Sequence, residues 1–181
     1  MTYAEMRIED GSDSAGLPIR STIAECWLGS VLVAATDKGI CAILLGDDPA
    51  ILRRDLEDRF PEARMLGSDE ALERLAAKVV GFIEAPGQAL DLPLDPRGTA
   101  FQQRVWRALR AIPAGATASD AEIARRIGAP NEAYAVGEAC AANAIAAAIP
   151  CHRVVRKDGT LAGYRWGFTR TRALRTREAA A

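Results

Sequence analysis

A cysteine followed directly by a histidine is the feature of this 181-residue sequence most able to do chemistry. The pair is Cys151 and His152, and His152 is the only histidine of the chain. A thiol becomes a nucleophile at neutral pH when a base or a positive charge favours its thiolate, and imidazole is the side chain whose ordinary pKa lies nearest to 7. A Cys-His pair alone more often marks a buried structural cysteine beside an incidental histidine, so the surrounding residues must decide.

Those residues favour a nucleophile. Pro150 precedes the thiol and an extended Arg-Val-Val run follows His152, which predicts a turn that enters a strand. Because adjacent side chains of an extended chain point in opposite directions, a bridging water is a reasonable route for the thiol proton to the imidazole. His152 then needs an acidic partner to fix its tautomer, and Glu178 is the candidate.

Composition limits the other classes of protein. Hydrophobic residues make up 49% and charged residues 26%, as in an ordinary globular protein. The four cysteines show no C-x-x-C spacing and there is one histidine, so we expect free thiols and no metal site. No apolar stretch approaches the roughly 20 residues that span a bilayer, and the acidic start differs from a signal peptide. We therefore expect a cytoplasmic protein with no membrane partner.

Charge is divided unevenly along the chain. Residues 1–100 carry 10 Lys and Arg against 18 Asp and Glu, a net of −8, whereas residues 101–181 carry 13 against 6, a net of +7. An excess of arginine on a small domain is typical of a protein whose partner bears phosphates, because each contact releases condensed counterions. The alternative is a solvated surface whose two halves neutralise each other, and charge by itself favours neither.

The pattern of the first part predicts a small sheet followed by two helices. After a flexible polar leader over residues 1–18, three β-leaning runs with short glycine-containing connections predict an antiparallel meander. Helical spacing of apolar residues then predicts two helices. The five elements span residues 19–26, 30–36, 40–45, 49–59 and 69–84.

A loop with three prolines, residues 85–98, predicts a boundary between an N-terminal domain, 19–96, and a second domain, 97–181. We expect an α/β (α+β) fold in which a sheet with helices precedes a mostly helical domain. Two capping boxes each open a helix of this second domain, and they pair Thr99 with Gln102 and Ser119 with Glu122.

The helices of the second domain include a pattern typical of DNA-binding proteins. Gly128-Ala129-Pro130 predicts a tight turn with Pro130 at the first position of a helix that runs to about Ala142. Two short helices around such a turn match the helix-turn-helix unit, which presents its second helix to a DNA groove. The pattern is weak alone, and the arginine excess beside it strengthens the interpretation.

The segment around the cysteine resembles the active-site signature of the O6-alkylguanine-DNA alkyltransferases. The resemblance rests on Asn143, on Pro150-Cys151-His152-Arg153-Val154-Val155, and on Gly-Thr-Leu-Ala-Gly-Tyr-Arg-Trp-Gly at residues 159–167. Residues 97–106 resemble the opening of that family's catalytic domain. Residues 26–29 and 39–48 resemble its N-terminal domain as found in bacterial adaptive-response (Ada) proteins, whose zinc-binding domain has no counterpart in this sequence.

The resemblance implies a single-turnover DNA repair enzyme, a methylated-DNA-[protein]-cysteine S-methyltransferase. Such an enzyme flips an alkylated guanine out of double-stranded DNA and moves the O6-alkyl group irreversibly to Cys151. No cofactor is implied, because the damaged base is itself the alkyl donor. The resemblance also implies a ribonuclease H-like N-terminal sheet, a helix-turn-helix in the catalytic domain and a monomeric protein.

Roles carry over to this sequence by motif. Cys151 is the alkyl acceptor, His152 the water-mediated base, Glu178 the group that orients His152, and Asn143 a support for the cysteine loop. The implied substrate-binding residues are Tyr164, Val154, Asp120, Gly163 and Arg165. The implied DNA-binding residues are Tyr134, Ala135, Gly137, Arg153, Thr117 and Ser119.

Two residues depart from the family's pattern. Asp120 stands where the family usually has a tyrosine, so a phenol that would donate to the leaving guanine is replaced by a carboxylate that only accepts when ionised. Tyr134 stands where the family usually has the arginine that enters the duplex, and a tyrosine can wedge but carries no charge. We expect an intact nucleophile with weakened DNA handling, in a divergent natural paralogue or in an engineered variant that reacts with free O6-alkylguanine derivatives.

Two other functions stay open on the residue types. A non-transferring binder of alkylated DNA would keep the fold and use the pocket only for recognition, although family members of that kind lack the cysteine. A Cys-His-Glu hydrolase would need an oxyanion hole and usually a histidine from a distant segment, and the sequence signals neither.

Overall fold

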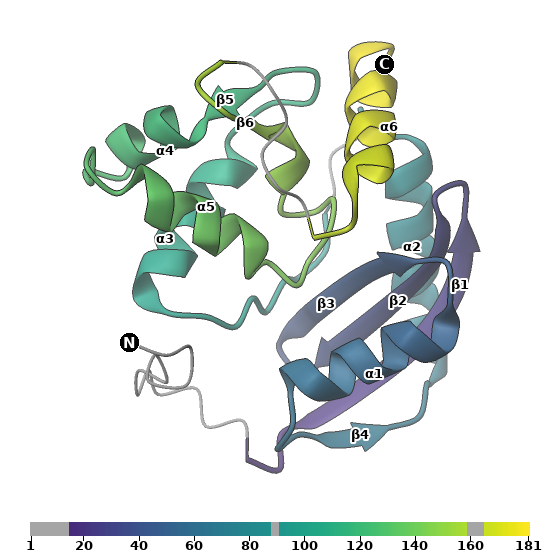
Figure 1. The fold of residues 1–181 in the computed structure, drawn as a ribbon. Helices are drawn as coiled ribbons and strands as arrows, with labels where there is room; N and C mark the ends of the chain where they lie inside the picture. Colours follow the sequence, from purple (N-terminus) through teal and green to yellow (C-terminus); the bar gives the residue numbers. More distant parts are fainter. Residues whose placement is uncertain (1–14, 88–90, 159–164) are drawn as a thin grey trace.

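The first part of the chain folds around a four-stranded sheet (Figure 1). The computed structural model describes residues 15–87, 91–158 and 165–181. The strands of the sheet are β1 (Pro18–Cys26), β2 (Gly29–Thr36), β3 (Gly39–Gly46) and β4 (Arg64–Leu66). The first three pair antiparallel, which confirms the predicted meander, and β4 joins β1 in parallel to give the order β3-β2-β1-β4. The sequence analysis missed β4, because three residues are too few to show a periodic pattern.

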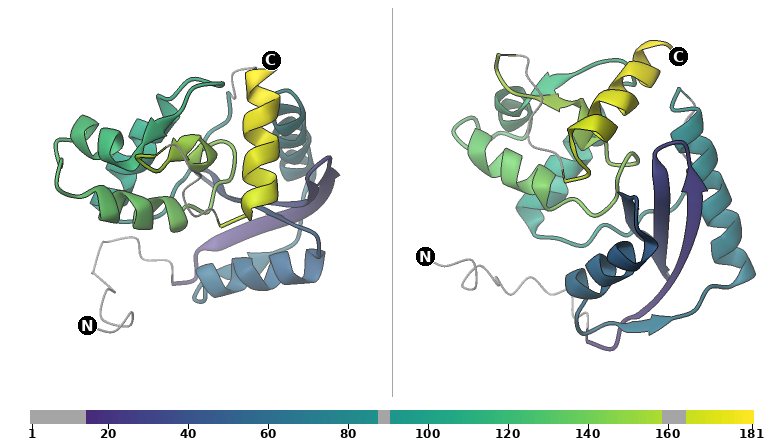
Figure 2. Two further views of the ribbon diagram at one scale, coloured as in Figure 1. Left: turned by 45° about the horizontal axis from the view of Figure 1, so that its top comes forward. Right: turned by 45° about the vertical axis from the view of Figure 1, so that its right-hand side comes forward.

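Helices cover both faces of this sheet. α1 (Pro49–Arg59) lies on one face and α2 (Glu70–Glu84) on the other (Figures 1 and 2). An aspartate caps each N-terminus, Asp48 for α1 and Asp69 for α2. Seven consecutive residues of β3 are buried, as expected for a strand with both faces covered.

The second part of the chain is mostly helical, as predicted. Its helices are α3 (Ala100–Arg110), α4 (Asp120–Arg126), α5 (Ala133–Ala141) and α6 (Phe168–Ala179), with a 3-10 turn η1 (Cys151–Arg153) and a parallel pair of short strands, β5 (Ala118–Ser119) and β6 (Val154–Val155). Both predicted capping boxes are present, at the starts of α3 and α4. Within the described ranges, no helix is long and apolar enough to cross a lipid bilayer.

The predicted start of α5 is wrong. The helix begins at Ala133 rather than at Pro130, because a further turn comes first, in which the Glu132 N–H donates to Ala129 O over 2.9 Å. Pro130 lies within that turn. The glycine of the predicted tight turn, Gly128, is present with a φ of 76°.

Backbone pairing connects the free edge of the sheet to the helical part. Ile43 of β3 donates its N–H to Ala144 O over 2.8 Å and accepts from the Ala146 N–H over 3.0 Å. At the end of α1, the half-buried Arg59 donates to Ala142 O over 3.0 Å, and burial lowers the pKa of its guanidinium to about 10. The loop that leads to Cys151 is therefore held against the sheet.

Candidate active site

Cys151 begins the η1 turn, and its side chain is buried. Four residues earlier, Ala147 has a φ of 64°, a left-handed conformation that costs a non-glycine residue roughly 1–2 kcal/mol. After the turn, Val154 pairs with Ala118, so β6 and β5 fix the cysteine turn to the start of α4. The predicted turn that enters a strand is confirmed.

Asn143 holds the cysteine loop together from inside. The residue is 2% exposed, and its Nδ2 donates to Ile145 O over 3.3 Å, to Ile149 O over 3.0 Å and to Cys151 Sγ over 3.2 Å. Its Oδ1 accepts from the Ile145 N–H over 2.8 Å. One amide thus satisfies three backbone groups of the loop and also contacts the thiol, which is the geometry expected of a residue that supports the loop.

The thiol rests in its protonated form. Burial raises the pKa of Cys151 well above its ordinary value, and the thiol of Cys140 on α5 raises it further, whereas the hydrogen bond from Asn143 lowers it. A nucleophilic reaction at neutral pH therefore needs a base. The sequence analysis did not single out Cys140, because its proximity to Cys151 arises only when α5 packs beside the loop.

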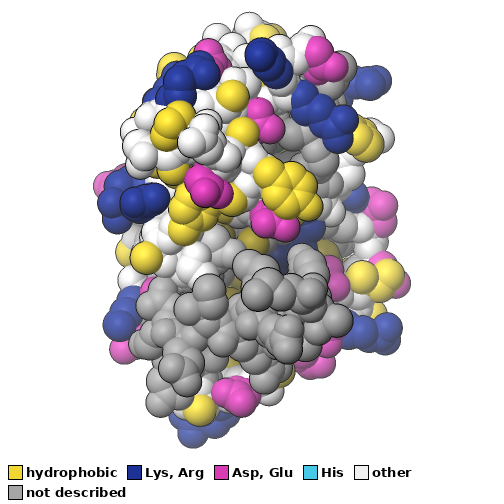
Figure 3. Space-filling view, turned by 60° about the vertical axis from the view of Figure 1, so that its left-hand side comes forward, with side chains coloured by type: hydrophobic (Ala, Val, Ile, Leu, Met, Phe, Trp, Pro, Cys, Tyr) yellow, Lys and Arg dark blue, Asp and Glu magenta, His cyan; other side chains and the backbone are white. Residues whose placement is uncertain are grey.

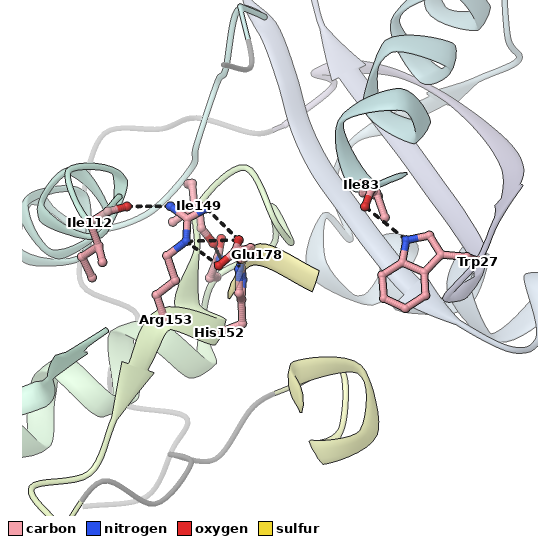
Figure 4. A network of polar contacts seen from close by, with 8 residues as sticks. Trp27, Ile83, Ile112, Ile149, His152, Arg153 and Glu178 are labelled. Carbon is pink, nitrogen blue, oxygen red and sulfur yellow. Dashed lines mark hydrogen bonds and ion pairs between the residues drawn. The ribbon is translucent and has the colours of Figure 1, made fainter. Parts of the chain in front are cut away.

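Next to the thiol, His152, Arg153 and Glu178 form a buried network (Figure 4). Glu178 Oε1 lies 2.6 Å from His152 Nε2, while Arg153 donates to Oε1 over 2.7 Å and to Oε2 over 3.0 Å. Burial alone would raise the pKa of Glu178, but hydrogen bonds and charge from His152 and Arg153 lower it to about 2. An ionised carboxylate that faces Nε2 favours the tautomer with its proton on Nε2 and makes Nδ1 the basic nitrogen.

Arg153 corrects the sequence analysis, which expected it to contact DNA. The side chain is 9% exposed, and besides its bonds to Glu178 it donates to Ile112 O over 2.6 Å. Its guanidinium therefore connects the cysteine turn to α6 and to the end of α3 instead of reaching a phosphate. The available signal was its place between His152 and a buried strand, where a charged side chain has to be paired.

The other residues expected to contact DNA lie around α4 and α5. Tyr134 is 82% exposed near the start of α5, and Ala135 and Gly137 are half-buried on the same helix. Thr117 is exposed before β5, and the Ser119 hydroxyl caps α4 by accepting from a backbone N–H. Figure 3 shows the side of the molecule that carries these helices, with Lys and Arg side chains along its border and acidic side chains among them.

The residues expected to bind the substrate are only partly described. Val154 is buried in β6, and Asp120 is half-buried at the start of α4, where it accepts from the next backbone N–H over 2.8 Å. Arg165 is exposed, and its guanidinium lies 5.6 Å from the centre of the neighbouring indole ring. Tyr164 and Gly163 lie outside the described residues. In the described part, no group of three or more His, Cys, Asp or Glu could hold a metal ion.

The chain is similar to known proteins over most of its length. Residues 100–180 match the family model described as 6-O-methylguanine DNA methyltransferase, DNA binding domain. The chain is 51% identical over 163 residues to the bifunctional transcriptional activator/DNA repair enzyme Ada of Escherichia coli (strain K12), a match that covers 90% of this chain and 46% of that protein. It therefore spans about half the length of that relative, and likewise 50% of the regulatory protein ada of Salmonella typhimurium.

Shorter relatives match over most of their own length. The methylated-DNA--protein-cysteine methyltransferase of Mycolicibacterium paratuberculosis is 42% identical over 138 residues, which are 72% of this chain and 81% of that protein. The crystal structure of Mycobacterium tuberculosis OGT in complex with DNA has a TM-score of 0.75 and 33% identity, and the match covers 91% of this chain and 94% of that chain. The fold is the mixed α+β arrangement of these proteins, and the chain belongs to the methylated-DNA--protein-cysteine methyltransferase family.

Proposed function

We propose that this chain is a DNA repair enzyme that moves the O6-alkyl group of guanine in double-stranded DNA to Cys151, once and irreversibly. One observation carries the proposal: a buried thiol contacts the Asn143 amide and precedes an imidazole whose Nε2 faces ionised Glu178. The names of the relatives as methyltransferases and DNA repair enzymes support the same reaction. The lesion is itself the alkyl donor, so the proposal includes no cofactor.

The proposed reaction is a displacement at the alkyl carbon. Cys151 Sγ forms a bond to that carbon while the bond from carbon to O6 breaks, and the electron pair of the broken bond stays with the guanine. The thiol proton passes through a water molecule to His152 Nδ1, and the imidazolium then gives a proton to the departing base. A thioether has no ready route back to a thiol, so each molecule reacts once.

For the DNA side, we propose that α4 and α5 form a helix-turn-helix within a catalytic domain over residues 97–181. The packing of α4 against α5 and the turn at Gly128 support it. Tyr134, 82% exposed near the start of α5, is placed to wedge into the duplex beside the extruded base. Ala135 and Gly137 on this helix are small enough to let a DNA backbone approach closely.

The remaining parts of the proposal concern the rest of the chain. The N-terminal domain, residues 19–96, would be ribonuclease H-like, which its three antiparallel strands with a fourth in parallel support. Because the relatives are bacterial and bacterial DNA lies in the cytoplasm, we expect the chain to act there, as a monomer.

Intact mass spectrometry tests the reaction. The chain is incubated with a duplex that contains O6-methylguanine and, separately, with free O6-benzylguanine. We expect one methyl or one benzyl group per chain, no gain in Cys151→Ala, and an unchanged gain in the control Cys26→Ala, which removes a half-buried thiol of β1.

Three outcomes would contradict parts of the proposal. Retention of the duplex without a mass gain would show a non-transferring binder of the lesion. Turnover of an ester or peptide beyond one equivalent would show a hydrolase. Transfer from the free base without transfer from the duplex would remove DNA as the substrate.

A further inference from the structure

An open pocket of about 780 Å³ lies between α6 and the segment that leads into β5. Its described lining includes three arginines, Arg156 after β6 and Arg172 and Arg175 on α6, together with the hydroxyl-bearing Thr117 and Thr176. The acidic residue in this lining is the Glu178 carboxylate, which is already bound by the histidine and arginine of the cysteine turn. The pocket therefore gathers cationic groups that the protein itself leaves without an anion.

Helix α6 divides its arginines between two tasks. Arg170 forms a 2.6 Å ion pair with the loop after β3, and the Arg177 guanidinium lies 4.3 Å from the centre of the indole ring between β1 and β2. These two side chains join α6 to the first part of the chain. Arg172 and Arg175 form no ion pair among the residues that the structure describes.

The spacing of the unpaired arginines also points to a missing anion. Arg172 and Arg175 are three residues apart, so they occupy neighbouring positions on one helix face, where like charges destabilise the helix. Arg156 brings a third positive charge to the same pocket from β6. A bound anion with several oxygens would offset this repulsion, and guanidinium groups match phosphate oxygens in pairs of hydrogen bonds.

We propose that this pocket binds a phosphate group of the DNA backbone, beside the α4–α5 surface and separate from it. The inference rests on the proposed function. Thr117 is exposed in the pocket lining and lies two residues before Ser119, which caps α4, so the pocket borders the proposed helix-turn-helix. The same chemistry would accept a free phosphate, and the experiment separates the two sources.

The test compares two double variants that lose the same charge. Binding of a short unmodified duplex is measured by fluorescence anisotropy over a range of salt concentrations. In Arg172→Gln/Arg175→Gln, we expect the slope of log K against log salt to become less steep by about 1–2, since each lost phosphate contact removes about 0.9. Arg53→Gln/Arg54→Gln, which neutralises two exposed arginines of α1, should keep the wild-type slope.

Further arms make the result decisive. Arg172→Lys/Arg175→Lys keeps both charges and should retain most of the slope, which separates lost charge from a damaged helix. A wild-type slope in the glutamine variant overturns the inference. Saturable binding of inorganic phosphate that the glutamine variant loses, with no change in the DNA slope, would assign the pocket to free phosphate and also overturn it. Transfer from free O6-benzylguanine to the wild-type chain tests the proposed function separately, because that donor carries no phosphate.

Discussion

The amide of Asn143 contacts both the nucleophile and the loop that carries it. Asn143→Ala should lower the free energy of unfolding by about 1–3 kcal/mol, because the buried Ile145 N–H loses its partner. The variant should also slow alkyl transfer at neutral pH, since the bond that lowers the Cys151 pKa is gone. Urea unfolding and the transfer rate from free O6-benzylguanine measure the two effects.

Asn143→Asp separates these effects. It keeps an acceptor for the Ile145 N–H but places a carboxylate beside the thiol, which disfavours the thiolate. We expect it to react more slowly than Asn143→Ala. A wild-type transfer rate in both variants would show that the amide does not assist Cys151.

Glu178 gives the fold a defined dependence on acid. Its pKa in the folded chain is about 2, below the ordinary value of 4.5, so its ionised form stabilises the fold above about pH 4.5. That contribution, about 3 kcal/mol, is lost as the pH falls from there through 2. Urea unfolding over this range should show a steeper loss of stability in the wild type than in Glu178→Gln. Parallel curves for the two proteins would contradict this assignment.

At the scale of elements, α4 and α5 carry the two departures from the family's pattern. Asp120 adds a negative charge at the start of α4, and Tyr134 presents an uncharged ring near the start of α5. Asp120→Tyr combined with Tyr134→Arg should therefore speed transfer from an O6-methylguanine duplex and leave the rate from free O6-benzylguanine much less changed. The ratio of the two rates, measured by mass, checks this. An unchanged ratio would mean that neither residue limits DNA handling.

Local signals in the sequence predicted most elements. The capping boxes at Thr99 and Ser119 act over three residues, so both helix starts were found from sequence alone. The start of α5 was missed because Pro130 fits a turn as well as a first helical position. Strand β4 exists through its pairing with β1, a contact between residues far apart in sequence.

The candidate site was predictable only where a motif carried it. Cys151, His152, Asn143 and Glu178 were found through the resemblance, and the structure brings the last two into contact with the first two. The role of Arg153 was misjudged, because residue type and charge say nothing about burial. An arginine-rich segment can serve a phosphate-bearing partner or the fold, and only the contacts of each side chain distinguish the two.

At the scale of the whole molecule, the site depends on how the two parts of the chain meet. The sheet edge holds the loop before Cys151 through Ile43, and α6 carries Glu178 while it leans on the first part through Arg170. Arg170 donates to Leu28 O over 3.0 Å as well as to Asp47. A displacement of α6 would therefore move the carboxylate that faces His152.

Arg170 and Asp47 allow the energy of this junction to be located. The Asp47 side chain is 89% exposed, so its half of the ion pair is screened by solvent, and Asp47→Ala should cost less than about 1 kcal/mol. Arg170 is 19% exposed, and Arg170→Ala also leaves Leu28 O without its donor, so we expect a loss of about 1–3 kcal/mol and slower transfer to Cys151. Urea unfolding and transfer rates measure both variants. Equal losses would place the energy in the ion pair, and no loss in either would show that α6 is held by its apolar contacts alone.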